Sequence, residues 1–134
     1  MTGGSSNPFP RSVVQETVFH GTNVGNITEF NTRGEQSNGA IFFASDLEEA
    51  EIHGANKSGD QYMYEVKLDI QNPMRVSNMY EWGDPGFEGK AIRQAKRQGY
   101  DSVIFDNGFD GDERSEFYAV FSPKQVKIAN RRKI

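Results

Sequence analysis

Four short stretches of the sequence contain side chains that could work together in one polar site. The run His20-Gly21-Thr22 brings an imidazole, an unhindered backbone and a hydroxyl to the end of an apolar run. Ser45 ends a second apolar run, the helix predicted after it carries a histidine, and Glu116 opens a late apolar run. These groups supply hydrogen-bond donors, acceptors and a negative charge. A buried strand that ends in polar residues delivers them into a cleft, so we expect a pocket that begins at His20.

Each of these signals alone also has an ordinary structural explanation. A single histidine at a strand end is more often a structural residue, and an aromatic pair such as Phe42-Phe43 usually belongs to the core. A glutamate at the start of a strand is usually a surface charge. The case for a shared site therefore depends on the combination of the residues and on the elements that position them.

The composition limits the classes of protein to which the chain can belong. Its 134 residues fit one domain with a real core. The formal net charge of -4 argues against binding of nucleic acid or of an anionic membrane through bulk charge. The absence of cysteine excludes a disulfide framework and a thiolate metal site. No apolar run approaches the roughly 20 residues that cross a bilayer, so no membrane association is expected.

Hydrophobic periodicity predicts the elements that would carry these residues. Strands are expected at residues 12–20, 40–45, 62–70, 100–105, 116–121 and 125–128, and helices at residues 47–56 and 88–98. The third strand is the clearest, because Tyr62, Tyr64 and Val66 alternate with residues of the opposite face. The second helix has an apolar stripe that includes Ala91 and Ala95.

The order of these elements is strand, strand, helix, strand, helix and then three strands. It favours an α+β domain with two main helices and a mostly antiparallel β-sheet that is split into two packed sheets. Residues 1–11, rich in Gly, Ser and Pro, are expected to be a flexible leader. Residues 12–134 are expected to form a single domain with a short basic tail at residues 131–133.

Taken together, these stretches resemble the ADP-ribosyltransferase fold of the diphtheria-toxin and poly(ADP-ribose) polymerase kind. The pocket of that fold is built from a His, one or two Tyr and a Glu, in that chain order. The matching segments are residues 18–22 (VFHGT), 39–46 (GAIFFASD) and 116–118 (EFY). Segments at residues 64–68, 72–73, 99–103 and 118–127 look most like the small domains of phage polyvalent proteins and related mobile-element effectors. The likeness covers roughly residues 14–129.

The resemblance implies that the pocket binds NAD as a substrate, with the nicotinamide buried. The backbone of Gly21 would hold the carboxamide, a close approach that glycine permits because it has no side chain. His20 would hydrogen-bond a ribose hydroxyl, and Thr22 would support the adenosine side. No metal is needed for this chemistry.

The same resemblance gives roles to residues of the later segments. Phe43 would stack on the nicotinamide, Ser45 would offer its hydroxyl to the amide, and His53 would form the other wall. Glu116 would be the catalytic residue. It would hydrogen-bond the nicotinamide ribose and stabilise the oxocarbenium-like charge that develops as the glycosidic bond breaks, much as a carboxylate does in glycoside hydrolysis.

The chain departs from the family pattern at three positions. Relatives commonly have Tyr where this chain has Phe43, and a second Tyr where it has His53. Arg114 stands two residues before Glu116, where arginine-modifying relatives carry Gln or Glu, so arginine is not the expected acceptor. The acidic loop at residues 106–115 lies just ahead of the strand of Glu116, where relatives read their targets.

The resemblance therefore predicts a mono-ADP-ribosyltransferase, a glycosyltransferase that passes ADP-ribose to a macromolecular acceptor, in first place a target protein. A toxin-like effector role is expected, in the cytoplasm of the producing, infected or target cell. Two alternatives stay open: a non-catalytic protein of the same fold that binds a partner, and transfer to a small molecule or simple NAD hydrolysis. Nucleic-acid binding would rest only on the basic residues 131–133 and is not favoured. No oligomeric state is predicted.

Overall fold

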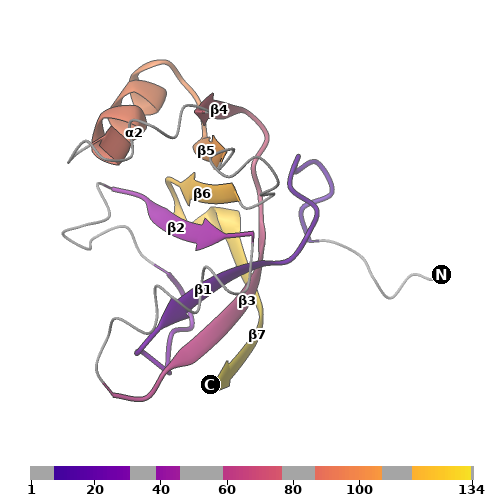
Figure 1. The fold of residues 1–134 in the computed structure, drawn as a ribbon. Coiled ribbons are helices and arrows are strands. Elements are labelled where there is room, and N and C mark those ends of the chain that lie inside the picture. Colours follow the sequence, from indigo (N-terminus) through magenta and orange to yellow (C-terminus); the bar gives the residue numbers. More distant parts are fainter. Residues whose placement is uncertain (1–7, 31–38, 46–58, 77–86, 107–115, 134) are drawn as a thin grey trace.

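The computed structural model describes residues 8–30, 39–45, 59–76, 87–106 and 116–133, with residues 87, 88 and 106 described by their backbone alone. Within these ranges the chain forms seven strands, one α-helix and one short 3-10 helix (Figure 1). In chain order they are β1 (Val18–Thr22), β2 (Ile41–Ala44), β3 (Tyr62–Leu68), β4 (Pro73–Val76), α2 (Phe87–Arg97), β5 (Ser102–Asp106), β6 (Glu116–Val120), η2 (Pro123–Gln125) and β7 (Val126–Lys133).

The seven strands form one mixed sheet in the order β4-β5-β6-β2-β1-β3-β7. β4 and β5 run parallel, and every other neighbouring pair is antiparallel. α2 lies between β4 and β5 in the chain, because parallel neighbours need a long crossover connection.

The predicted fold class is therefore wrong in its architecture. The strands do not form two sheets packed face to face. β4, β5, β6 and β2 are joined to β1, β3 and β7 in one sheet, because β1 and β2 pair edge to edge at Phe19 and Ala44. Two main helices were expected, whereas the described residues contain α2 as their one α-helix. The helix predicted at residues 47–56 lies outside the described residues.

The junction between β1 and β2 has the fewest paired residues of any in the described sheet. One Cα pair is in register there, whereas β1 shares five pairs with β3, and β2 shares four with β6. Figure 1 shows β1 and β2 meeting near the end of β2 and diverging toward the end of β1. The polar run His20-Gly21-Thr22 therefore lies where the two strands separate.

α2 covers one face of the sheet. Its buried residues Ala91, Ile92 and Ala95 pack with Val103 and Phe105 of β5, which confirms the apolar stripe predicted for this helix. Within the described part of the chain, neither α2 nor any other helix combines the length and the apolar character needed to span a bilayer.

The segments on either side of β1, residues 12–17 and 23–30, pack against the opposite face. Val14 and Phe30 belong to the same buried cluster as the core residues of β1, β2, β3 and β6. The buried Ser12 anchors the start of this segment, because its hydroxyl accepts the backbone N–H groups of Val14 (3.2 Å) and Ile70 (2.9 Å). The strand predicted at residues 12–20 is shorter than expected. β1 begins only at Val18, because the stretch before it is anchored by Ser12.

Gln125 fixes the corner that leads into the last strand. Its side-chain amide donates to the carbonyl oxygens of Asp69 (2.9 Å) and Asp101 (3.0 Å). Its Oε1 atom accepts the N–H groups of Phe121 (2.9 Å) and Ser122 (3.0 Å). β7 then pairs with the whole of β3, so the predicted basic tail is the end of a paired strand with exposed side chains.

Candidate active site

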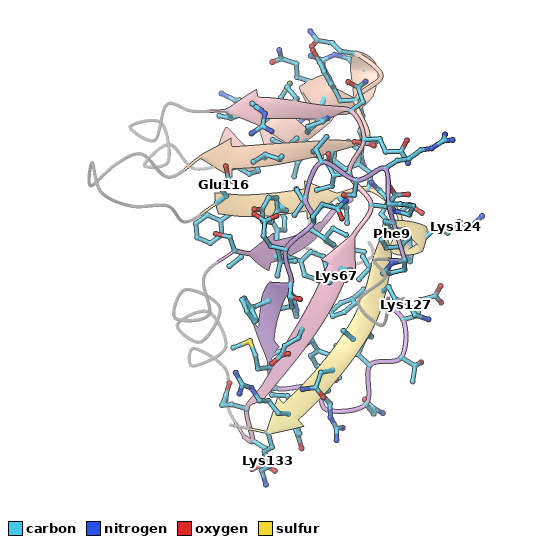
Figure 2. The ribbon with its side chains drawn as sticks, turned by 90° about the vertical axis from the view of Figure 1, so that its right-hand side faces the viewer. Phe9, Lys67, Glu116, Lys124, Lys127 and Lys133 are labelled. Carbon is cyan, nitrogen blue, oxygen red and sulfur yellow. The ribbon has the colours of Figure 1, made fainter. Side chains whose placement is uncertain are left out.

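Three adjacent strands bring His20, Phe43 and Glu116 to one face of the sheet. β1, β2 and β6 are neighbours, and their registers set Phe43 between His20 on one side and Tyr118 on the other. Side chains at alternate positions of a strand share a face, so Glu116 lies on the same face as Tyr118, two residues later. Figure 2 shows Glu116 at the start of β6.

The backbone of Glu116 is held by Ser45, just beyond the end of β2. The N–H group of Ser45 donates to the carbonyl oxygen of Glu116 (2.9 Å), and the hydroxyl of Ser45 accepts the N–H group of Glu116 (2.7 Å). The side chain of Ser45 thus continues the β2–β6 pairing by one residue. Its predicted contact with the nicotinamide amide stays a prediction, and its hydroxyl already has this partner.

Tyr118 holds the carboxylate of Glu116. Its hydroxyl donates to Glu116 Oε1 over 2.8 Å, and its side chain is only 2% exposed. Burial raises the pKa of Tyr118 well above its ordinary value, and the hydrogen bond and negative charge of Glu116 raise it further. The hydroxyl therefore stays protonated and remains a donor. Sequence reasoning did not give Tyr118 a role, although a spacing of two on a strand places both side chains on one face.

His20 makes its described hydrogen bond across the junction between β1 and β2. Its Nδ1 atom lies 2.8 Å from the backbone carbonyl oxygen of Phe42. The ring also packs edge-on against Phe30, with centroids 4.9 Å apart, and tilted against Phe43 at 5.6 Å. The half-buried imidazole is thus fixed in orientation by one polar and two aromatic contacts.

Phe30 is a site neighbour that sequence reasoning missed. Its ring meets those of Phe43 and Tyr64 edge-to-face, at centroid distances of 5.3 Å and 5.5 Å. Phe43 is 2% exposed in this arrangement, so stacking of nicotinamide on Phe43 requires the covering rings to shift. The only sequence signal was an isolated apolar residue in a polar loop, which does not distinguish a core residue from a site residue.

The other two residues of the first stretch are buried in β1. Gly21 is paired with Met63 of β3. Thr22 is 5% exposed, and its hydroxyl oxygen accepts the N–H group of Val24 over 3.2 Å. The predicted contacts of both residues with NAD stay predictions.

Two further predicted features lie outside the described residues. They are His53 and most of the acidic loop before β6, including Arg114. Among the residues that the structure describes, no three His, Asp or Glu side chains come together in a group that could hold a metal ion.

A comparison with protein families identifies the family of the chain. The family model described as "ADP-Ribosyltransferase in polyvalent proteins" matches residues 15–133. Because the match spans nearly the whole chain, the protein belongs to this ADP-ribosyltransferase family, and the resemblance seen in the sequence is confirmed. A comparison with curated proteins gave no match.

Proposed function

We propose that this protein is a mono-ADP-ribosyltransferase that cleaves NAD, releases nicotinamide and transfers ADP-ribose to a macromolecular acceptor, a target protein. Membership of the family supports transferase activity in general. The observation that carries the proposal is the position of Glu116, which is held at the start of β6 on the same sheet face as His20.

The reaction that fits these residues breaks one glycosidic bond and forms another. The bond between the ribose C1′ and the nicotinamide nitrogen breaks, and its electron pair leaves with nicotinamide. Glu116 stabilises the positive charge that develops on the ribose and hydrogen-bonds its hydroxyl. The acceptor then bonds to C1′ and loses its proton. His20 orients a ribose hydroxyl of NAD, and the backbone of Gly21 holds the carboxamide.

The charge of the residue two positions before Glu116 bears on the type of acceptor residue. Arg114, two residues before Glu116, stands where a carboxylate or amide would recognise an arginine, and its positive charge disfavours that acceptor. An acceptor residue other than arginine on a target protein, modified by an effector in the cytoplasm, is the role we propose.

The test uses Glu116→Gln, which keeps the shape of the side chain and removes its charge. Wild-type protein incubated with labelled NAD and a cell lysate is expected to release nicotinamide and to label a protein band. Glu116→Gln is expected to bind NAD and to lose about 100-fold or more in rate, as when a single stabilising group is removed from an active site. Glu65→Gln is the matched control, because Glu65 lies on the opposite face in a partly exposed pair with Arg132. Label transfer that survives in Glu116→Gln would contradict the proposal.

One observation favours a second candidate, a non-catalytic member of the fold that binds a partner. Phe43, the predicted stacking surface for nicotinamide, is covered by Phe30. This alternative predicts no nicotinamide release by the wild-type protein in the same assay. Release of nicotinamide with free ADP-ribose and no labelled protein would instead indicate NAD hydrolysis.

A further inference from the structure

We infer that Tyr118 is the positioning residue for Glu116: its hydroxyl fixes one carboxylate oxygen and thereby orients the other toward the ribose of NAD. This inference rests on the proposed function. Its geometric basis is the 2.8 Å hydrogen bond from the Tyr118 hydroxyl to Glu116 Oε1. Within the described residues the structure records no hydrogen bond to Oε2, the oxygen that the substrate would meet.

The ring of Tyr118 is itself held in place. β6 lies between β2 and β5, and Tyr118 is paired with Phe43 on one side and Ile104 on the other. All three side chains belong to one buried cluster. A hydroxyl on so constrained a ring has little freedom, so it sets the carboxylate rather than following it.

The hydroxyl is not needed for packing. A phenylalanine would fill the same core position, and burying a hydroxyl costs free energy unless it is hydrogen-bonded. Here the partner is an ionisable carboxylate, with which the bond is stronger than one between neutral groups. Glu16 and Arg75 also act on Tyr118 electrostatically and in opposite senses, but the direct partner is Glu116.

Tyr64 is the natural comparison, because it carries a buried hydroxyl with a purely structural role. It lies in β3 on the same face, and its hydroxyl donates to the carbonyl oxygen of Val24 (2.7 Å) and accepts the N–H group of Ile27 (3.0 Å). Removing either hydroxyl should cost stability. Only the loss of the Tyr118 hydroxyl should change the chemical step.

The experiment compares Tyr118→Phe, Tyr64→Phe and Glu116→Gln in nicotinamide release by the full chain, with thermal unfolding of each variant. For Tyr118→Phe we expect kcat to fall about tenfold, with KM for NAD changed less than about twofold, because the interaction acts on the transition state. Tyr64→Phe should lose a similar amount of stability and keep kcat within about twofold.

The outcomes separate this inference from the proposed function. If Glu116→Gln is inactive and Tyr118→Phe keeps the kcat of the wild type, the positioning role is overturned while the proposed function stands. An equal fall in kcat for Tyr64→Phe would also overturn it, since the effect would then be a general loss of packing. Full activity of Glu116→Gln, or no nicotinamide release by the wild type, would overturn both.

Discussion

The imidazole of His20 and the backbone carbonyl of Phe42 lie 2.8 Å apart across the junction between β1 and β2. A carbonyl oxygen only accepts, so the proton of the neutral ring is on Nδ1 and Nε2 is its acceptor. In the proposed function the ribose of NAD would meet Nε2, so the structural role and the proposed binding role of the histidine would fall on separate atoms.

This division predicts different results for two substitutions of His20. His20→Asn can keep a donor near the position of Nδ1 but loses the ring contacts with Phe30 and Phe43, so it should lose about 1 kcal/mol in the free energy of unfolding. Its KM for NAD should rise about tenfold with the loss of one substrate hydrogen bond. His20→Phe keeps the ring packing but removes both nitrogens, so it should lose stability as well. Thermal unfolding and initial rates over a range of NAD concentrations measure the two effects. An unchanged KM in both variants would remove His20 from the NAD site.

Phe30 is predicted to stabilise the fold through its three ring contacts. Phe30→Leu keeps an apolar side chain but loses the edge-to-face geometry with His20, Phe43 and Tyr64. We expect a loss of roughly 1–3 kcal/mol in the free energy of unfolding, measured by urea denaturation. The control is Val24→Ala in the same segment, where the side chain is 44% exposed and the change should stay below about 0.5 kcal/mol. Equal effects of the two substitutions would contradict the importance of the rings.

The raised pKa of Tyr118 predicts a loss of stability in alkaline solution. Above a pH of about 10 the unfolded chain loses the tyrosine proton, while the folded chain keeps it. The folded state then binds more protons than the unfolded state, so the free energy of unfolding falls as pH rises. The stability advantage of the wild type over Tyr118→Phe, measured by urea denaturation from pH 8 to pH 11, should therefore shrink above about pH 10. A constant difference over that range would show that Tyr118 ionises alike in both states.

We predict that glutamate, which has the same shape as glutamine, cannot replace Gln125 without a loss of stability. In Gln125→Glu, a carboxylate cannot donate to the carbonyl oxygens of Asp69 and Asp101, and it places negative charge beside them. We expect a loss of roughly 2–4 kcal/mol in the free energy of unfolding at neutral pH. The same change at the exposed Gln94 of α2 should cost less than about 1 kcal/mol. Comparable losses at both positions would contradict the role of the corner.

The elements that could be predicted from the sequence are those with a local signature. The alternation that begins at Tyr62 corresponds to β3, and the apolar stripe of the second predicted helix corresponds to α2. β4 was missed, because Pro73 indicates the end of a strand. In the structure Pro73 is the first residue of an edge strand, where the missing N–H group is tolerated. The parallel pairing of β4 with β5 joins two segments that α2 separates in the chain, so no local sequence pattern indicates it.

The sequence indicates candidate site residues, but it does not indicate the contacts between them. Motif order alone selected His20, Ser45 and Glu116, and the structure places His20 on β1, Ser45 just beyond the end of β2 and Glu116 at the start of β6. That the hydroxyl of Ser45 holds the backbone of Glu116, and that Tyr118 holds its carboxylate, follows from the register of β2 with β6. A register between distant segments is set by tertiary packing, and a single sequence does not display it.

The insertion of β6 between β2 and β5 also bears on how the chain folds. The hydrogen bond from Glu116 to Ser45 closes a loop of 71 residues, and such distant contacts form slowly because the chain must first lose much of its freedom. The carboxylate therefore reaches its place only when both neighbouring strands are present to receive β6. Activity should therefore require the pairing of β6 with both β2 and β5, and a form in which these strands are unpaired should be inactive.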